Sequence, residues 1–318
     1  MLVSSQAQMQ PCLYPAMLTL IQAVLKPTGY IQRIICNVYS QYPCATMAKF
    51  TLLLLLLGFA SGGMAAPAAE LWPVWQNHAD RETVRIDHSA WWHFLQHYLV
   101  KTSDSINRVD YAGVSAQDKT NLQDYLDALQ QLPVSRLTRA QQRAYWINLY
   151  NAGTVKLILE HYPVQSILDI DISPGWFSNG PWDSKLYNIE GRPVSLNDIE
   201  HRILRPIWQD PRIHYALNCA SLGCPNLQPE PFTAEHSEQM LEQAARAFVN
   251  HPRGVHIEDA ELVVSSIYHW FKADFGGSDQ GVIDHLGRFA EAGLAARLGK
   301  LHKISGHQYD WSLNDSGE

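Results

Sequence analysis

A short cysteine-containing segment is the part of this sequence most suited to chemistry. It runs from His214 to Pro225 and reads HYALNCASLGCP, with Cys219 and Cys224 five positions apart. We expect residues 212–217 to form a strand, so that Cys219 lies at the junction where small residues follow. A helical turn starting there would present unpaired N–H groups to the thiol and favour the thiolate. Cys219 is therefore a candidate nucleophile, provided that a histidine takes its proton.

Three other interpretations of the cysteines stay open. A disulfide between Cys219 and Cys224 needs only a suitable Cα separation. A metal site would use both thiols with His214, although a C-x4-C pair lacks the usual second pair of ligands. Both side chains could also be buried and unreactive. We favour the disulfide, because an export signal expected over residues 47–68 would place the pair in an oxidising compartment.

His214 is the histidine nearest to Cys219 in the sequence. In a strand the two side chains point to opposite faces, and in a helix five positions separate them by about 140°. A turn at Asn218 would be needed to bring them together. The structural interpretation is that His214 packs and forms hydrogen bonds in the core.

Glu200 and His201 supply a second candidate base, on a helix expected over residues 199–204. Either side chain could approach the thiol through the tertiary fold. The structural interpretation gives this helix a solvated face with an ion pair between Asp198 and Arg202, four positions apart.

Amide and carboxylate groups elsewhere could orient such a histidine. Asn148 and Asn151 lie three positions apart on a helix expected over residues 139–161. Buried unpaired amides cost free energy, so the two predict a buried hydrogen-bond network that supports the fold or lines a site. Asp274 and His269 fall on different faces of a later helix; Asp274 is the candidate orienting group, or else a helix-terminal carboxylate.

Aromatic residues concentrate in the loop-like residues 172–193, where Trp176, Phe177 and Trp182 could stack on sugars or peptides or cover the core. The elements around these segments are mixed and rich in helix. Helices are expected over residues 90–100, 116–132, 139–161, 199–204, 233–248, 266–275 and 282–298. Strands are expected over residues 108–111 and 212–217, with a hairpin over 254–259 and 261–265. Few strands separated by helices predict an α+β fold with a small sheet.

The boundaries of the longest helix are the best marked. Thr138 and Gln141 have the spacing of a capping box, which predicts its start. Pro163 predicts its end near His161, because a proline ring clashes with the preceding turn.

An export signal is expected to begin at Met47. One lysine precedes an unbroken leucine run over residues 52–57, and Ala66-Pro67-Ala68 then fits a small-x-small cleavage site. The apolar run is too short for a membrane span, which needs about 20 residues. Residues 1–46 would therefore be a mis-assigned upstream extension, 47–68 a signal peptide, and 69–318 a single globular domain. This predicts a periplasmic or secreted protein without a stable membrane span after cleavage.

The charge of the expected mature chain excludes some partners. Three of the 24 Lys and Arg residues and none of the 31 Asp and Glu residues lie in residues 1–68, so residues 69–318 carry a net charge of −10. This charge repels phosphate backbones, and nucleic acid is not expected as a partner. Cys12, Cys36 and Cys44 precede the cleavage site, which leaves only Cys219 and Cys224.

Four segments together resemble domain-of-unknown-function family 547. They begin at Tyr145 (YWINLYNA), Ser195 (SLNDIEHRILR), Asp210 (DPRIHYALNCASLGCP) and Tyr268 (YHWFKADF), and they span about residues 140–275. The resemblance implies a single α+β domain, found in bacterial exported proteins, with no established activity. The family pattern includes the residues matched by Asn148, Asn151, Glu200, His201, Arg205, His214, Cys219, Cys224 and Asp274. His269 falls outside it.

The sequence supports two hypotheses about function. The first is a thiol-dependent hydrolase or acyl/amide transferase, with Cys219 as nucleophile, His214 or His201 as base, and Asn148 or Asp274 as orienting group. The second is a non-catalytic binding or scaffold domain stapled by a Cys219–Cys224 disulfide. The expected ligand is an unidentified small molecule, peptide or cell-wall component, and no cofactor or metal is expected.

Overall fold

The computed structural model describes residues 67–174 and 180–317. The predicted upstream extension and nearly all of the predicted signal peptide lie outside these residues, as do Cys12, Cys36, Cys44, Trp176 and Phe177. Ala66–Glu318 form one compact unit. None of the helices in the described ranges combines the length and apolar character needed to cross a bilayer.

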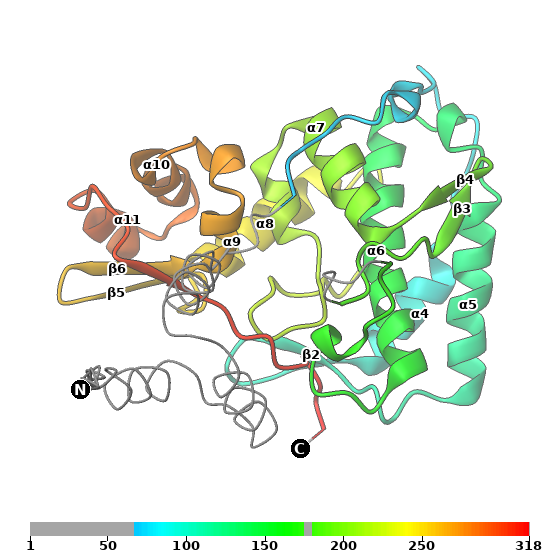
Figure 1. Ribbon diagram of the computed structural model, residues 1–318, viewed down its shortest axis with the longest axis horizontal. Helices are drawn as coiled ribbons and strands as arrows, with labels where there is room; N and C mark the ends of the chain where they lie inside the picture. The colour runs from blue at the N-terminus through cyan, green and yellow to red at the C-terminus, as the bar shows by residue number, and fades with distance from the viewer. Residues whose placement is uncertain (1–66, 175–179, 318) are drawn as a thin grey trace, which may run out of the picture. The chain divides into compact units, whose positions relative to one another are not determined.

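Helices dominate the described residues, and the strands are short (Figure 1). The α-helices are α4 (Ser89–Tyr98), α5 (Ala116–Gln130), α6 (Arg139–His161), α7 (Arg205–Trp208), α8 (Ser237–Val249), α9 (Ser266–Trp270), α10 (Asp279–Phe289) and α11 (Ala292–Leu298). The 3-10 helices are η1 (Pro73–Gln76), η2 (Val134–Arg136), η3 (Ile167–Asp169), η5 (Pro211–Tyr215) and η6 (Lys272–Phe275), and η4 (Asp198–Leu204) is a π-helix. The strands are β1 (Leu99–Lys101), β2 (Asn107–Val109), β3 (Tyr187–Ile189), β4 (Arg192–Val194), β5 (Val255–Glu258), β6 (Glu261–Ser265) and β7 (Gly306–Gln308). The predicted α+β class is confirmed.

Helix α6 is the long buried element around which the larger core forms. Its predicted bounds are confirmed: the Thr138 side chain accepts a hydrogen bond from the Gln141 N–H, and the Gln141 side chain reaches back to complete the capping box. Most of the helix is buried, polar residues included, so it is enclosed by other elements rather than covered on one face. Polar groups on α6 must therefore find partners inside the protein.

The strands pair in three small sheets within the described ranges. β1 pairs antiparallel with β2, β3 with β4, and β5 with β6, while β7 adds parallel to β6. The predicted hairpin between β5 and β6 is confirmed. Its two turn residues, Asp259 and Ala260, have φ of 46° and 65°, as a tight two-residue hairpin turn requires.

Two hydrophobic clusters fill the interior. The larger one surrounds α6 and includes side chains of α4, α5 and η4, such as Trp91, Tyr125 and Ile203. The smaller one lies between β5, β6, α8 and α10 and includes Phe248 and Tyr268. The segment 211–224 contributes to both, since Ile213 and Leu217 belong to the larger cluster and Tyr215 to the smaller.

The C-terminal strap, residues 306–316, crosses the cysteine-containing segment (Figure 1, red). Gly223 N–H donates to the Asp310 carbonyl, Leu222 N–H donates to the Ser312 carbonyl, and Asn314 N–H donates to the Ala220 carbonyl. A Cβ at Gly223 would lie 2.8 Å from the Asp310 nitrogen, so this close approach requires glycine. The last residues of the chain thus complete the fold around the cysteines.

Several sequence expectations are wrong in detail. Residues 212–217 do not form a strand, because Asp210 caps a 3-10 helix by accepting from Arg212 N–H, and Pro211 fixes the backbone at its first position. The helix expected over 233–248 begins only at Ser237. Those expected over 266–275 and 282–298 are each divided in two.

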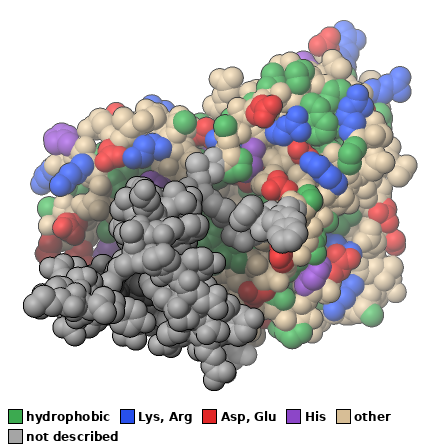
Figure 2. Space-filling model, in the orientation of Figure 1, with side chains coloured by type: hydrophobic (Ala, Val, Ile, Leu, Met, Phe, Trp, Pro, Cys, Tyr) green, Lys and Arg blue, Asp and Glu red, His purple; other side chains and the backbone are tan. Residues whose placement is uncertain are grey.

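Acidic and basic side chains are interspersed on the molecular surface that Figure 2 shows. Such mixing is the usual arrangement of a solvated protein surface. Glu200, His201 and His214, by contrast, are buried.

Candidate functional site

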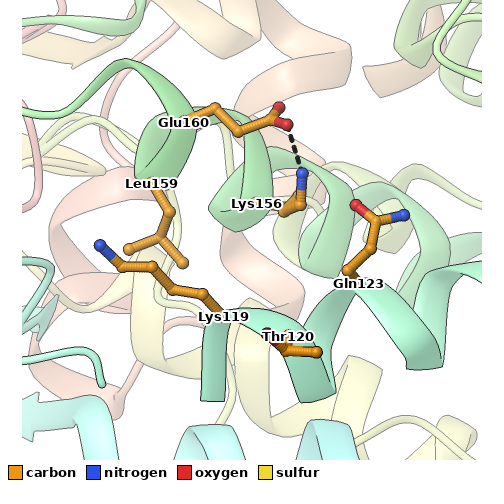
Figure 3. Close-up of a pocket in the computed structure, with 6 residues that line it drawn as sticks. All are labelled: Lys119, Thr120, Gln123, Lys156, Leu159 and Glu160. Atoms are coloured by element: carbon orange, nitrogen blue, oxygen red, sulfur yellow. Dashed lines mark hydrogen bonds and ion pairs between the residues drawn. The ribbon is translucent and has the colours of Figure 1, made fainter. Parts of the chain in front are cut away.

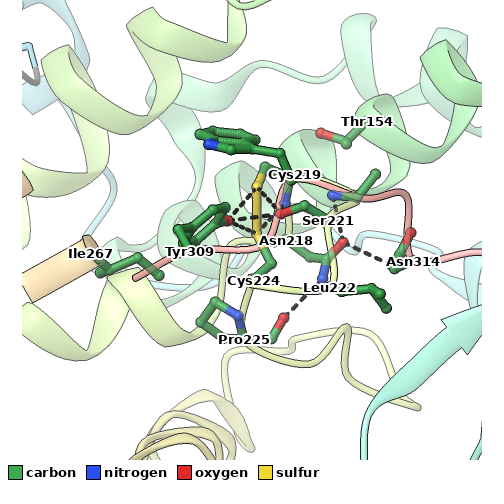
Figure 4. The surroundings of a disulfide bond; sticks show 12 residues. Thr154, Asn218, Cys219, Ser221, Leu222, Cys224, Pro225, Ile267, Tyr309 and Asn314 are labelled. Carbon is green, nitrogen blue, oxygen red and sulfur yellow. Dashed lines mark hydrogen bonds between the residues drawn. A yellow bond between two sulfur atoms is a disulfide. The ribbon is translucent and has the colours of Figure 1, made fainter. Parts of the chain in front are cut away.

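The cysteine pair and two hydroxyl groups form what we call the sulfur site, which consists of Cys219, Ser221, Cys224 and Tyr309 (Figure 4). The two sulfur atoms lie at disulfide distance, with the Cα atoms 6.3 Å apart. The Tyr309 hydroxyl lies 3.0 Å from the Cys219 Sγ, 3.1 Å from the Cys224 Sγ and 2.8 Å from the Ser221 Oγ. The Cys219 N–H donates to the Cys224 Sγ at 2.9 Å. Hydrogen-bond donors therefore converge on the sulfurs.

The two asparagines of α6 hold the segments that lead to the sulfur site. Asn151 donates to the Ala216 carbonyl at 2.8 Å and accepts from the Asn218 N–H at 2.9 Å. Asn148 forms the same two kinds of bond with the backbone of Phe232, at 2.7 and 3.0 Å. The predicted buried hydrogen-bond network is confirmed. It fixes the backbone just before Cys219 to the central helix.

A second group of polar side chains, the charge cluster, consists of Glu200, His201, Arg205, His214 and Asp274. Asp274 is its centre: its Oδ2 lies 2.7 Å from the His214 Nε2 and accepts from the Arg205 Nε at 2.6 Å. The other nitrogen of His214, Nδ1, lies 3.5 Å from the Glu200 Oε1. Arg205 also donates from Nη1 to the His201 Nδ1 at 3.0 Å. Segments far apart in the sequence thus meet in one ion-pair network.

Phe271 forms an apolar wall of the charge cluster. Its ring stacks on that of His214 with centroids 4.3 Å apart, and the Arg205 guanidinium lies 4.7 Å above it. A neighbouring apolar ring excludes water and strengthens the ion pairs beside it.

The carboxylates of the charge cluster are held ionised. Burial alone would raise the pKa of Glu200, but the neighbouring His201 ring, a hydrogen bond from His214 and the charges of His214 and Arg205 outweigh burial and lower the pKa to about 2. Burial also opposes ionisation of Asp274, yet hydrogen bonds from His214 and Arg205 hold the pKa of this carboxyl far below its usual range. Two negative charges are therefore present at neutral pH, one buried at Glu200 and one half-buried at Asp274.

The pKa values of the two histidines are shifted in opposite directions. Burial would lower the pKa of His214, but hydrogen bonds to Asp274 and Glu200 raise it above its ordinary value and so favour the charged ring. Burial lowers the pKa of His201, and the charge of Arg205 acts in the same direction. His201 is the neutral ring and accepts from Arg205 through Nδ1.

The π-helix η4 places Glu200 and His201 in this arrangement. The expected helix is present, but its wider turn continues into α7 at Arg205. Such wide turns often occur at functional positions. The predicted pair between Asp198 and Arg202 is confirmed at 3.2 Å, whereas Glu200 and His201 are buried rather than on a solvated face.

The candidate residues therefore divide into two sites. Glu200, His201, His214 and Asp274 meet in the charge cluster, and Asn148 and Asn151 hold the backbone. Among the contacts of residues 67–174 and 180–317, none joins a histidine ring to the Cys219 sulfur. His269 lies outside both sites, with its ring stacked on that of His307.

Sequence reasoning missed three of the four members of an aromatic cluster that adjoins the sulfur site through Tyr309. The aromatic cluster consists of Trp182, Trp270, Tyr309 and Trp311, all half-buried. Trp311 contacts the other three, with ring centroids 5.9, 5.7 and 4.6 Å away from those of Trp182, Trp270 and Tyr309. Only Trp182 was singled out from the sequence, since the others come from late segments that carry no common spacing.

Surface hollows lie elsewhere. One, between α5 and α6, is lined by Lys119, Thr120, Gln123, Lys156, Leu159 and Glu160, and Lys156 pairs there with Glu160 (Figure 3). None of these is a candidate residue. In the part of the chain that the structure describes, no group of three or more His, Cys, Asp or Glu side chains is arranged to hold a metal ion. The metal interpretation of the cysteines thus has no ligand set there.

The fold and these sites define an α+β domain built around one long buried helix. Residues 134–249 match the model of a family described as "protein of unknown function, DUF547", and the chain contains a domain of that family. The match includes the candidate residues from Asn148 to Cys224, while Asp274 lies beyond it. No curated protein and no solved structure matches the chain.

Proposed function

We propose that this is a non-catalytic ligand-binding domain whose cysteine segment is stapled by a Cys219–Cys224 disulfide. One observation carries the proposal: the nucleophile and the bases that a thiol hydrolase would need are engaged separately. The sulfurs contact each other and the hydroxyls of Ser221 and Tyr309. His214 and His201 are held by carboxylates and an arginine.

The aromatic cluster supports a binding role. Its four half-buried rings form one contiguous group beside the sulfur site, which they join through Tyr309. The face of an aromatic ring is electron-rich and attracts the C–H groups of a sugar or the apolar side chains of a peptide. We therefore assign this cluster as the ligand contact, and a cell-wall glycan or its attached peptide as the ligand.

Export belongs to the same proposal. A signal peptide over residues 47–68 would place the domain in the periplasm or outside the cell, where such polymers are found. The test is the N-terminal sequence of the protein recovered from the envelope of a producing cell: it should begin at Ala69. A protein retained inside the cell with residues 1–46 intact would contradict export.

Binding is tested by co-sedimentation of the purified protein with insoluble peptidoglycan. Trp182→Ala and Trp311→Ala are expected to weaken binding about tenfold or more, because each removes a contact surface. Trp92→Ala is the matched control, since Trp92 is an exposed tryptophan, 52% accessible, on α4. Circular dichroism confirms that the variants fold.

Binding that persists in both cluster variants would contradict the site, and absence of binding to peptidoglycan would contradict the ligand class. Soluble β-1,4-linked N-acetylglucosamine oligomers and the free stem peptide, used as competitors, separate glycan from peptide recognition. Cys219→Ser under reducing conditions should leave binding unchanged.

A thiol hydrolase is the second candidate, favoured by the partial exposure of Cys219 beside the buried Cys224. It predicts turnover of p-nitrophenyl acetate by reduced protein that is lost in Cys219→Ser and kept in Cys224→Ser. Equal rates in the two variants would exclude Cys219 as the nucleophile.

A further inference from the structure

We infer that the Cys219–Cys224 pair is an exchange site for external dithiols rather than an inert staple. This goes beyond ligand binding and does not depend on it. The inference rests on where hydrogen-bond donors are placed, on which sulfur is accessible, and on a nearby arginine charge.

Two donors are directed at the Cys224 sulfur. The Cys219 N–H lies 2.9 Å from it and the Tyr309 hydroxyl 3.1 Å. A sulfur in a disulfide carries no charge, and donors of this kind gain most when it becomes a thiolate. The site is therefore organised for a negative charge on Cys224 that exists only after the S–S bond has broken.

Tyr309 is itself supported as a donor. Figure 4 shows its hydroxyl beside both sulfurs and the Ser221 hydroxyl, which lies 2.8 Å away and can donate to the phenol oxygen while the phenol donates to sulfur. Hydrogen bonds in such a chain strengthen one another.

Arg253 places a positive charge beside the cysteine-containing segment. Arg253 donates to the Leu222 carbonyl at 2.9 Å and to the Asn226 side chain at 2.6 Å. Within residues 67–174 and 180–317 it has no carboxylate partner, and its Nε is buried without a hydrogen bond. Burial raises the pKa of the Tyr309 phenol and keeps it a protonated donor, although the Arg253 charge acts in the opposite direction.

The exposure of the two cysteine residues gives the reaction a direction. Cys219 is half-buried, whereas Cys224 is only 4% exposed. An incoming thiolate therefore attacks the Cys219 sulfur. The S–S bond breaks, its electron pair stays on the Cys224 sulfur, and the resulting thiolate accepts the hydrogen bonds from Cys219 N–H and Tyr309.

The second half of the reaction uses the other thiol of the reagent. Its thiolate attacks the reagent sulfur of the mixed disulfide and releases Cys219 as a thiolate, which takes a proton from water. The reagent leaves as a disulfide, oxidised by two electrons, and the protein holds two reduced cysteines. Tyr309 and Ser221 act here as positioning residues.

The experiment measures how fast dithiothreitol reduces the pair in the native full-length protein. Trypsin releases residues 213–246 as one peptide that contains Cys219 and Cys224 and no other cysteine. Alkylation of timed samples followed by mass spectrometry of this peptide therefore gives the rate without interference from Cys12, Cys36 or Cys44.

Tyr309→Phe keeps the ring and removes the donor, and it is expected to slow reduction about tenfold, the typical effect of one hydrogen bond to a charged group. Ser221→Ala should have a smaller effect in the same direction. Tyr111→Phe is the matched control: Tyr111 also binds the C-terminal strap through its hydroxyl, but at Asn314, 2.9 Å away, and not at a sulfur.

Oxidised glutathione identifies the accessible cysteine: the lone protein thiolate attacks it, releases one reduced glutathione and keeps the other as a mixed disulfide. This product is expected on Cys219 in Cys224→Ser but not on Cys224 in Cys219→Ser. A reduction rate equal to the rate of global unfolding in urea would overturn the inference, as would equal rates for Tyr309→Phe and Tyr111→Phe. Thermal unfolding of each variant verifies that it is folded at the assay temperature.

Discussion

The charge cluster and the sulfur site are both polar and largely buried, yet their polar groups are compensated in different ways. In the charge cluster, Asp274 and Glu200 are ionised and are compensated by Arg205 and by His214, whose charged form they favour. In the sulfur site the groups are neutral, and hydroxyl and N–H donors satisfy them. The first arrangement depends on charge balance and therefore on pH, whereas the second depends on the oxidation state of two sulfurs.

Removal of the central carboxylate should have the largest effect. Asp274→Asn leaves the charges of Arg205 and His214 without their common partner, and we expect a loss of about 3–5 kcal/mol in the free energy of unfolding. Urea denaturation measures it. Asp284→Asn, on the exposed face of α10, is the control and should change stability by less than about 0.5 kcal/mol. A loss below about 1 kcal/mol at Asp274 would mean that the ion pairs are not balanced as described.

The charge cluster should also make the free energy of unfolding decrease in acid. The pKa of Glu200 is about 2 in the folded protein, against 4.5 ordinarily, so its contribution is fully present above pH 4.5 and is lost as the pH falls toward 2. The shift corresponds to about 3 kcal/mol. Glu200→Gln should therefore be less stable than the parent at pH 7, and the difference should narrow below pH 4.5. A difference that stays constant from pH 7 to pH 3 would refute this role of Glu200.

Asn151 connects both sites to α6, and Asn151→Ala should cost about 2–3 kcal/mol, because the Ala216 carbonyl and the Asn218 N–H lose their buried partner. Asn188→Ala, on an exposed position of β3, serves as its control in the same denaturation assay. Similar losses of unfolding free energy in the two variants would indicate that the hydrogen bonds of Asn151 do not stabilise the fold.

The sulfur site should show the smallest effect on stability. The double variant Cys219→Ser/Cys224→Ser opens a loop of six residues, for which chain entropy predicts a loss of about 2 kcal/mol. The loss should be the same at pH 7 and pH 4, because neither the disulfide nor serine titrates in that range. A marked pH dependence would show that the sulfur site shares the charges of its neighbour.

The sequence was most informative where a local signal or the family resemblance was strong. Thr138, Gln141 and Pro163 set the bounds of α6, and the spacing of Asn148 and Asn151 indicated buried amides. The resemblance indicated Glu200, Arg205, His214 and Asp274, which the structure brings together. Such signals can be recognised in a sequence because helix capping and the steric effect of proline involve residues only a few positions apart.

What the sequence did not reveal depends on contacts between distant segments. Tyr309 lies 85 residues from Cys224, and no periodicity relates them. The 3-10 helix at Ile213 replaced an expected strand because Asp210 and Pro211 act locally, whereas a strand needs a neighbour to pair with. The burial of Glu200 and His201 on η4 likewise depends on tertiary contacts, which their helix spacing does not show.

The C-terminal strap has a consequence for the order of synthesis. At typical rates of translation, about 5–20 residues per second, Tyr309 is added about 4–17 seconds after Cys224. During that interval the two cysteines already exist, but the hydroxyl that bridges them does not. A chain that ends before Tyr309, through premature termination or proteolysis, therefore keeps both cysteines and lacks the hydroxyl that contacts their sulfurs.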